Sequence, residues 1–178
     1  MTARIITPPA ALAVSLADAR NAARIDGTDS DADIEIQVSA ITAEAEHGTG
    51  RAIINRTYRV TLDAFPVCII VPASPLISVS SVKYFDLAGV EQTIDPSAYI
   101  VDAASEPGRI KPASAWPVAQ DRIGAVNVVA VCGYGPDDKS TPPVFKGYIL
   151  AKVREYYAPA GTPVNPDLDD RLHSLKVY

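Results

Sequence analysis

The distribution of proline along this 178-residue chain limits the structures that it can form. Most of its fifteen prolines lie between Pro66 and Pro143, whereas residues 10–65 and 144–158 contain none. Proline interrupts helices and central strands but is tolerated in turns and at sheet edges. The proline-free stretches can therefore hold helices, and the proline-rich stretch favours short strands joined by turns. The pattern predicts helices, then strands, then a helix.

Length and composition restrict the class of protein. A chain that is 48% hydrophobic and 21% charged is typical of one folded domain and not of a disordered protein. The net charge of −5 argues against a protein that binds nucleic acid non-specifically through its phosphates. Residues 1–14 contain only a weak apolar stretch, interrupted by Pro8, so we expect no signal peptide. No run approaches the roughly 18 apolar residues of a membrane-spanning helix.

Both cysteines lie within apolar, strand-like runs. Cys68 stands in VCIIV and Cys132 ends VVAVC. Free cysteine is among the most buried residue types, and disulfides are rare in cytosolic proteins. We therefore expect two buried free thiols in a soluble protein made in a reducing cytoplasm.

Two helices are predicted in the first proline-free stretch. The first begins at Ser15, where Asp18 completes a pattern similar to a capping box. The second begins near Ser30, with acidic residues in its first turns, where the helix dipole favours negative charge. Glycine is the commonest residue directly after a helix, so we expect the second helix to end at Gly48.

The second predicted helix has apolar residues on two faces. One face carries Ile34, Val38, Ile41 and Ala45, and the other carries Ile36, Ala40 and Ala43. A helix with two apolar faces is covered on both sides. It lies either in the middle of its own bundle or between its own core and a neighbouring subunit, and the sequence leaves both alternatives open.

The central region alternates apolar and polar residues with the period of a strand. Predicted strands cover residues 57–62, 67–71, 79–85, 90–94, 99–101 and 126–131. Short strands separated by turns favour a small antiparallel sheet or sandwich. A third helix is then predicted from Pro143, because proline is favoured in the first turn of a helix.

The end of the chain combines a linker with a short predicted helix. Residues 158–163 are rich in proline and small residues, and Asn165 followed by Pro166 is a good helix start. Leu168, Leu172 and Leu175 recur at helical spacing. A helix of about ten residues is marginal by itself, so these leucines must dock on something. The alternatives are the protein's own body and a partner or neighbouring subunit.

Motifs that would indicate catalysis or metal binding are missing from the sequence. The acidic run from Asp29 to Asp33 resembles the start of a calcium loop, but Ile34 replaces the required glycine and Ala40 the required glutamate. The two histidines occur in no zinc-ligand spacing, and the phosphate-loop and nucleophile-elbow motifs are absent. We therefore predict a protein that is not an enzyme and has no cofactor, no catalytic residue and no metal site.

One small basic cluster is present in the sequence. Arg51, Arg56 and Arg59 lie near the predicted junction of helix and strand. On an acidic chain, such a small cluster favours a solvated face or a salt bridge between subunits over a DNA-binding groove.

The order of these segments resembles the head–tail connector family of tailed phages and prophages, also called head-completion or adaptor proteins. The phrases that carry the resemblance, in chain order, are HGTGR (47–51), RTYRVTLDAFP (56–66), IIVPASPLISVSSVKYFDLAGV (69–90), DPSAYIVD (95–102), VVAVCGYG (128–135) and PPVFKGYILAKVREYY (142–157). The resemblance covers residues 5–158, and it consists of ordered strand and turn phrases without a catalytic signature.

The resemblance implies a structural role in the virion neck, after assembly in the host cytoplasm. Members of the family combine a helical bundle with a β-rich insertion and form a ring, expected to be dodecameric, on the portal protein. The ring also contacts the next neck or tail protein, and DNA passes through it without sequence-specific binding and without any membrane. The partner-binding residues nominated here are Ile5, Ile6, Ile36, Ala40, Ala43, Leu168, Leu172 and Leu175.

The sequence thus predicts an α+β fold in which a pair of N-terminal helices and a C-terminal helix form a small bundle with an inserted antiparallel β region. The expected domain is residues 1–158, with helices at about 15–47 and 143–158, a β region at about 57–135, and a tail at 159–178. Two other functions stay open. One is another phage morphogenesis protein, such as a tail-completion or tail-terminator subunit. The other is a small hydrolase or sugar-binding β domain.

Overall fold

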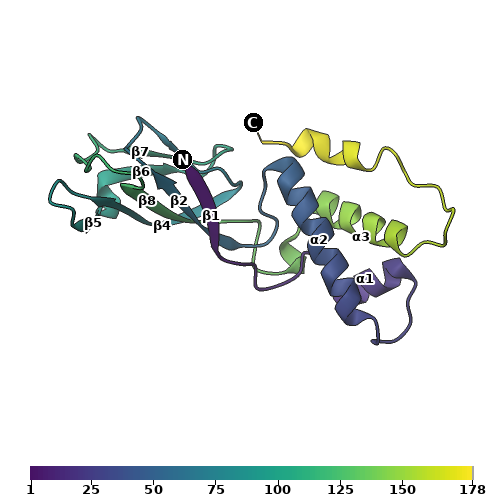
Figure 1. Ribbon diagram of the computed structural model, residues 1–178. Helices are drawn as coiled ribbons and strands as arrows, with labels where there is room; N and C mark the ends of the chain where they lie inside the picture. The colour runs from purple at the N-terminus through teal and green to yellow at the C-terminus, as the bar shows by residue number, and fades with distance from the viewer. Residues whose placement is uncertain (178) are drawn as a thin grey trace. The chain divides into compact units, whose positions relative to one another are not determined.

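The computed structural model describes residues 1–177 and divides the chain into two compact units (Figure 1). The β unit comprises Met1–Pro8 and Arg56–Gly133. The helical unit comprises Pro9–Asn55 and the segment from Tyr134 onward. The predicted inserted β region is thus a compact unit with its own core, and each unit is described by itself below.

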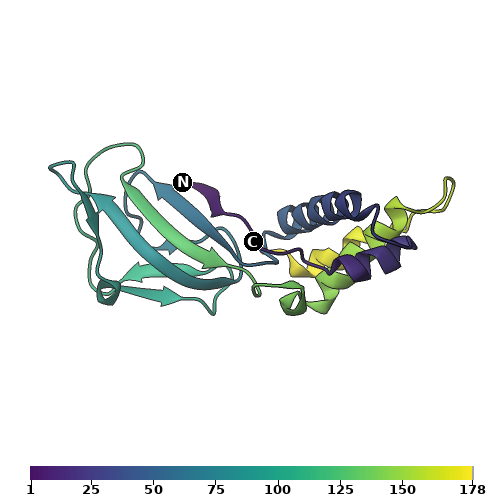
Figure 2. The ribbon, with the colours of Figure 1, turned by 90° about the horizontal axis from the view of Figure 1, so that it is seen from below.

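The larger sheet of the β unit has five strands in the order β1-β2-β8-β4-β5, and every pairing is antiparallel. Its strands are β1 (Thr2–Thr7), β2 (Arg56–Leu62), β4 (Leu76–Phe85), β5 (Glu91–Thr93) and β8 (Val126–Cys132). Strand β8 shows the alternation most clearly, because every second residue from Val126 to Cys132 is buried. Strands β1 and β5 are the two edges, and Figure 2 shows β1 (purple) beside the twisted central strands.

A smaller sheet in the same unit has the order β3-β7-β6. Its strands are β3 (Ile69–Ile70), β6 (Tyr99–Asp102), which follows the short helix η1 (Pro96–Ala98), and β7 (Arg109–Pro112). Ile69 and Ile110 are fully buried from this sheet, as are Val60 and Val128 from the larger one. The two sheets come close at Gly108, where an added Cβ would lie 2.6 Å from the Leu76 Cβ. No side chain larger than hydrogen fits there without a shift.

Two strands of the β unit were not predicted from the sequence. Strand β1 occupies the TARIIT segment, whose β-branched residues precede Pro8, and this segment was noted only as a weak apolar stretch. Strand β7 lies in the stretch between Pro107 and Pro112, where no strand was predicted. Pro112 stands at the end of the strand, a position where its missing N–H is tolerated.

The helical unit contains α1 (Leu16–Ala23), α2 (Asp31–Thr49) and α3 (Pro143–Tyr156), with the short helix η2 (Asp138–Ser140) preceding α3. The predicted start of α1 is confirmed, because the Ser15 hydroxyl accepts a hydrogen bond from the Asp18 N–H. The core of the unit is built around Ile34, Phe145 and Ile149, which are all 0% exposed.

Helix α2 ends later than the sequence predicted. Gly48 is helical, and the left-handed residue that ends the helix is Gly50, with φ 71°. The N–H of Gly50 donates to the carbonyl of Glu46, which closes the last turn. Gly48 and Gly50 stand close together, and residue type alone does not show which of two glycines ends a helix.

The C-terminal tail folds back within the helical unit. Its ordered turn is a 3₁₀ helix, η3 (Asp169–Leu175), rather than the predicted α-helix beginning at Asn165. Leu168 is 1% exposed and Leu172 is 6% exposed, and both belong to the core of the unit. Of the two alternatives left open by the sequence, the structure has the tail docked on the protein's own body.

Candidate partner-binding surfaces

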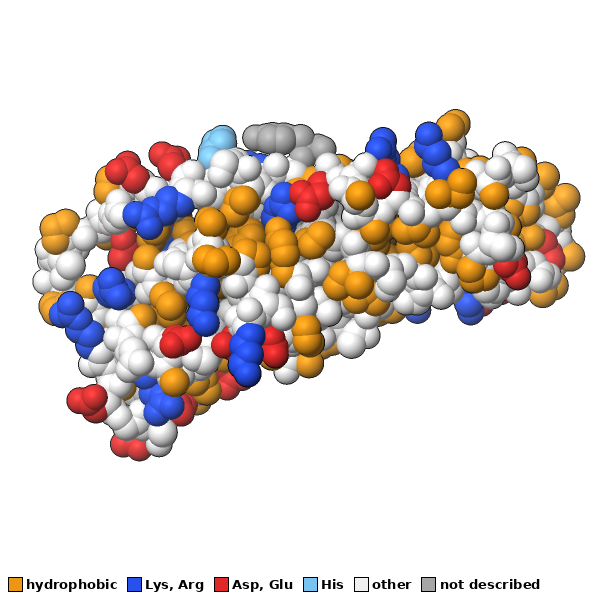
Figure 3. Space-filling model, turned by 180° about the vertical axis from the view of Figure 1, so that it is seen from behind, with side chains coloured by type: hydrophobic (Ala, Val, Ile, Leu, Met, Phe, Trp, Pro, Cys, Tyr) orange, Lys and Arg blue, Asp and Glu red, His pale blue; other side chains and the backbone are white. Residues whose placement is uncertain are grey.

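The described residues contain no group of three or more histidine, cysteine, aspartate or glutamate side chains that could hold a metal ion. Across residues 1–177, no helix is long and apolar enough to cross a membrane. On the face drawn in Figure 3, acidic and basic side chains are interspersed rather than gathered by sign. The candidate surfaces are exposed ones that could bind other proteins, as the predicted role in the virion neck requires.

The two cysteines are free thiols in the structure. Cys132 is buried in β8, and burial raises the pKa of its thiol to about 12. A thiol with a raised pKa is a poor nucleophile, because only the thiolate reacts. Cys68 is partly exposed, which corrects the expectation that both thiols are buried.

The first candidate surface is the edge formed by β1, which we name the β1 edge (Thr2–Thr7). All of its side chains are exposed, including Ile5 at 48% and Ile6 at 42%, two of the residues nominated from the sequence. The strand pairs with β2 on one side only, so its other side presents backbone N–H and carbonyl groups. An exposed sheet edge is a ready template for another strand.

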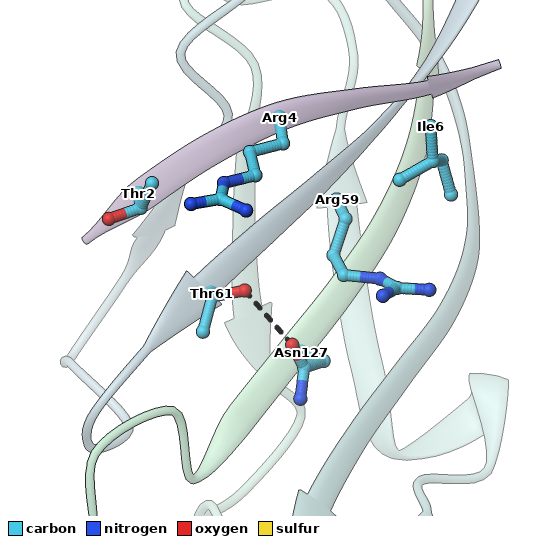
Figure 4. Close-up of a pocket in the computed structure, with 6 residues that line it drawn as sticks. All are labelled: Thr2, Arg4, Ile6, Arg59, Thr61 and Asn127. Atoms are coloured by element: carbon cyan, nitrogen blue, oxygen red, sulfur yellow. Dashed lines mark hydrogen bonds between the residues drawn. The ribbon is translucent and has the colours of Figure 1, made fainter.

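A shallow depression of about 320 Å³ lies on the sheet beside this edge. It is lined by Thr2, Arg4, Ile6, Arg59, Thr61 and Asn127, whose side chains come from three neighbouring strands (Figure 4). The Thr61 hydroxyl and the Asn127 side-chain oxygen are 3.0 Å apart and form a hydrogen bond. We call this side of the five-stranded sheet the outer face.

Two arginines stand directly opposite each other on the outer face. Arg4 of β1 is the register partner of Arg59 of β2, and both side chains are exposed. Like charges in a directly opposed cross-strand pair are destabilising. No described acidic side chain forms an ion pair with either arginine. The pair is therefore a site where a carboxylate from another chain would relieve repulsion.

The basic cluster noted in the sequence is divided in the structure. The Arg51 side chain is engaged within the helical unit, where it donates to the Leu175 carbonyl at 2.7 Å and to the Tyr134 hydroxyl at 2.8 Å. Arg59 instead faces Arg4, a residue that we did not nominate. The sequence contains one indication of Arg4, the strand-like composition of residues 2–7. A strand predicted there would have placed Arg4 on a sheet, although not opposite Arg59.

The second candidate surface is the outer stripe of α2, formed by Ile36, Ala40 and Ala43. All three residues are exposed, and Ile36 is 62% exposed. On the same helix, Ile34, Val38, Ile41 and Ala45 are buried in the core, which confirms the predicted buried face. The exposure of the outer stripe shows that α2 does not lie in the middle of its own bundle, and contact of this stripe with a neighbouring subunit stays a prediction. A shallow groove of about 390 Å³ runs beside this stripe, lined by Gln37, Ala40, Ile41, Glu44, Lys152, Glu155 and Tyr156.

The nominated leucines of the tail do not form a candidate surface. Leu168 and Leu172 are buried in the helical core, and Leu175 is partly buried against it. This burial removes them from the partner-binding set, because their apolar surface is already covered by the chain itself. The tail is held by polar contacts as well, since Asp169 accepts hydrogen bonds from Lys152 at 2.8 Å and from the Tyr148 hydroxyl at 3.1 Å.

These contacts lower the pKa of the Asp169 carboxyl, mainly through the hydrogen bond from Lys152. The same bond raises the pKa of the Lys152 ammonium. Each shift favours the charged form of its group, so the pair is an ion pair that fastens the tail to α3.

Comparison with solved structures identifies the fold. A chain in the neck of an empty gene transfer agent (GTA) particle, computed with C6 symmetry, is similar over 100% of this chain and 96% of that chain, with a TM-score of 0.83 and 20% identity. The chain has the fold of a protein in a GTA neck. Chains from the virion of a native GTA particle and from a native GTA neck computed with C12 symmetry are similar over the same shares, at TM-scores of 0.79 and 0.80 and 21% identity.

No protein-family model and no curated protein matches this sequence. The predicted fold class, a mixture of helices and antiparallel sheets, is confirmed by the structure and by the GTA neck chain. Because the likeness includes nearly all of both chains, the β unit and the helical unit both belong to the shared fold.

Proposed function

We propose that this protein is a structural subunit of the neck of a phage-like particle, a head–tail connector that joins the capsid to the tail. The observation that carries the proposal is the similarity of the entire chain, at a TM-score of 0.83, to a chain in the neck of a GTA particle. The segment order in the sequence supports the same family independently of the fold comparison.

The surfaces of the molecule are consistent with a role in assembly. The β1 edge and the outer stripe of α2 are both exposed, and each carries apolar side chains among polar ones. A ring uses heterologous contacts, in which one surface of each subunit meets a different surface of the next. A subunit with two distinct contact surfaces meets that requirement.

In this proposal, copies of the chain form a ring on the portal protein, and the opposite side of the ring receives the next neck or tail protein. Neck structures with similar chains were computed with C6 and C12 symmetry, and twelve copies is the ring size implied by the family resemblance. DNA passes through the ring without sequence-specific contacts. A net charge of −5 suits such a passage, because a strongly basic channel would retain the phosphates.

Deletion of the gene from the element that encodes the chain tests the function. Without the connector, we expect capsids and tails to be made but to stay separate when particles are viewed by electron microscopy. Supplying the full chain in trans restores joined particles, and the chain is then found in purified particles at ring stoichiometry.

A matched pair of variants shows whether the assembly surface is required. Ile36→Asp places a charge on the outer stripe of α2 and is expected to reduce joined particles, whereas Val164→Asp changes a residue of similar exposure in the tail linker and is expected to leave them unchanged. Normal, joined particles after deletion of the gene, or purified particles that lack the chain, would contradict the proposed function.

A further inference from the structure

The five-stranded sheet ends in two free edges that differ in charge. The β1 edge carries the opposed pair Arg4 and Arg59. At the other end, β5 pairs only with β4, and all three of its residues, Glu91–Thr93, are exposed. Val90, immediately before β5, is 54% exposed. Both edges thus offer unpaired backbone groups together with exposed apolar surface, and only one of them is basic.

We propose that neighbouring copies of this chain are joined by these edges, with β5 of one copy adding to β1 of the next. The occupant of the β1 edge is therefore a second copy of the chain, recognised through the backbone of its β5 edge and the carboxylate of Glu91. This inference rests on the proposed function, because it specifies how the subunits of the ring contact each other.

Strand direction allows the sheet to continue from copy to copy. The pairings β1–β2, β2–β8, β8–β4 and β4–β5 are all antiparallel, so β1 and β5 run in the same direction. When a second copy continues the sheet with its outer face on the same side, its β5 lies parallel to β1. A head-to-tail contact of this kind is heterologous and can close into a ring, whereas pairing of two β1 strands would join only two copies.

The charges of the two edges lie on the same face. Asn127 of β8 is the register partner of both Thr61 and Lys83, so Lys83 lies on the outer face together with Arg4 and Arg59. The Lys83 ammonium and the Glu91 carboxylate are 2.9 Å apart, which places Glu91 on this face too. The two arginines and Glu91 therefore lie on the same face of a continued sheet. A parallel register that sets Glu91 of one copy beside Arg4 of the next brings these charges together, and the same register sets Thr93 beside Ile6.

The short length of β5 limits the strength of the contact. Three residues provide a ladder of only a few hydrogen bonds, and a parallel ladder is slightly less stable than an antiparallel one. We therefore expect association at high concentration, or where other neck contacts hold the copies together. The charges determine which edges pair, because pairing of β1 with β1 would place the arginines of two copies against each other.

Cross-linking of two variants, each with one exposed cysteine, tests the pairing. In a Cys68→Ser background, Ile6→Cys marks the β1 edge and Thr93→Cys marks β5, while the native Cys132 stays buried and unreactive. With a short bismaleimide, the mixture of the two variants is expected to give a dimer band that neither variant gives alone. Ile123→Cys, at a residue 90% exposed in the same unit, replaces Thr93→Cys as the control and is expected to give no band.

Charge reversal supplies a second, independent test. Arg4→Glu and Glu91→Arg are each expected to weaken self-association by roughly tenfold or more in sedimentation, because each opposes like charges at the contact. A chain that carries both changes restores opposite charges and is expected to recover most of the association. Failure of the double variant to recover, while both single variants are folded, overturns the charge match.

The two proposals can fail separately. If the chain is present in the necks of purified particles but the mixed cross-link forms neither there nor in solution at any concentration, the edge pairing is wrong and the connector function stands. If the mixed cross-link forms in solution but the chain is absent from particles, the function is wrong and the pairing stands. Cross-links within either single variant would show pairing of like edges and would overturn the inference.

Discussion

The helical unit completes its hydrophobic core with its own C-terminal tail, whereas the β unit leaves both edges of its larger sheet unpaired within the described residues. Leu168 and Leu172 complete the helical core, and Lys152 and Asp169 hold the tail in place. On β1, by contrast, Ile5 and Ile6 are about half exposed, and Arg4 faces another arginine. The helical unit completes its core with its own tail and leaves the outer stripe of α2 exposed, whereas the β unit leaves two strand edges that a second chain could pair with.

This difference predicts that the stability of the protein and its association with other copies depend on different residues. Substitutions in the helical core and tail should change the free energy of unfolding and leave the sheet edges intact. Substitutions on the outer face should change contacts between copies and hardly change folding, because isolated surface changes usually alter stability by no more than about 0.5 kcal/mol. The following predictions test this separation, beginning with the largest effect.

Truncation of the central aromatic residue should damage the helical unit most. Phe145 is 0% exposed, and Phe145→Ala is expected to lower the free energy of unfolding by about 3–5 kcal/mol, because it removes buried surface and leaves a cavity. Denaturant unfolding measures the effect. Val144→Ala, at the adjacent residue that is 48% exposed, is the control and should change it by no more than about 0.5 kcal/mol.

Truncation of the tail anchor comes next. Leu168→Ala is expected to cost about 2–4 kcal/mol and to raise hydrogen exchange of the η3 amides, because Leu168 is 1% exposed in the helical core. Val164→Ala, in the exposed linker, should leave exchange unchanged. Unaltered protection of η3 in Leu168→Ala would mean that the tail does not depend on this anchor.

Substitution of glycine by alanine should lower the free energy of unfolding at Gly108 in the β unit and raise it at Gly147 in the helical unit. Gly108→Ala in the β unit is expected to cost about 1–3 kcal/mol, since its Cβ would lie 2.6 Å from the Leu76 Cβ and overpack the site. Gly147→Ala within α3 is expected to stabilise by about 0.5–1 kcal/mol, because nothing lies within 4 Å of the added Cβ and the unfolded chain becomes less flexible. Thermal unfolding measures whether each variant is less or more stable than the unaltered protein.

The smallest effect is the pH dependence of tail docking. The pKa of Asp169 lies below its usual 3.8 in the folded protein, mainly through the Lys152 hydrogen bond. A lowered carboxyl pKa contributes stability that is present above the unfolded value and is lost as pH falls through the folded value. Tail protection should therefore weaken as pH falls below about 4.

Asp169→Asn checks the origin of this dependence. The substitution should reduce tail protection at pH 7 and remove the additional loss in acid, with proteolysis of the tail as the measurement. Asp170→Asn is the matched control, because Asp170 is exposed and the hydrogen bonds from Lys152 and Tyr148 end on Asp169. An equal acid response in Asp169→Asn and the unaltered chain would assign the dependence to other groups.

Local signals in the sequence were sufficient for the elements with strong periodicity. The cap at Ser15, the buried face of α2 and the alternation of β8 depend on side chains a few residues apart, and all were predicted correctly. Strand β7 could not be predicted in this way, because the prolines around it indicate a loop and only its pairing with β3 and β6 makes it a strand.

The residues of the candidate surfaces could likewise be predicted only where the signal lies within one segment. Ile36, Ala40 and Ala43 could be nominated because helical spacing places them opposite the buried stripe of α2. The arginine pair could not, because Arg4 and Arg59 are 55 positions apart in the sequence and the register of β1 on β2 brings them together. Pairing between distant segments is a property of the folded chain, which periodicity within one segment does not report.

By itself, the proline distribution determined the order of helices, strands and helix that follows β1, since proline acts locally on the backbone wherever it occurs. The apolar periods then determined which faces of the helices and strands are buried. Only the tertiary structure decided that the tail leucines belong to the chain's own core and that two sheet edges, one of them carrying an opposed pair of arginines, stay open. The physical reason is that burial and pairing depend on what other segments cover, and a short apolar stripe has the same sequence whether its own chain or a partner covers it.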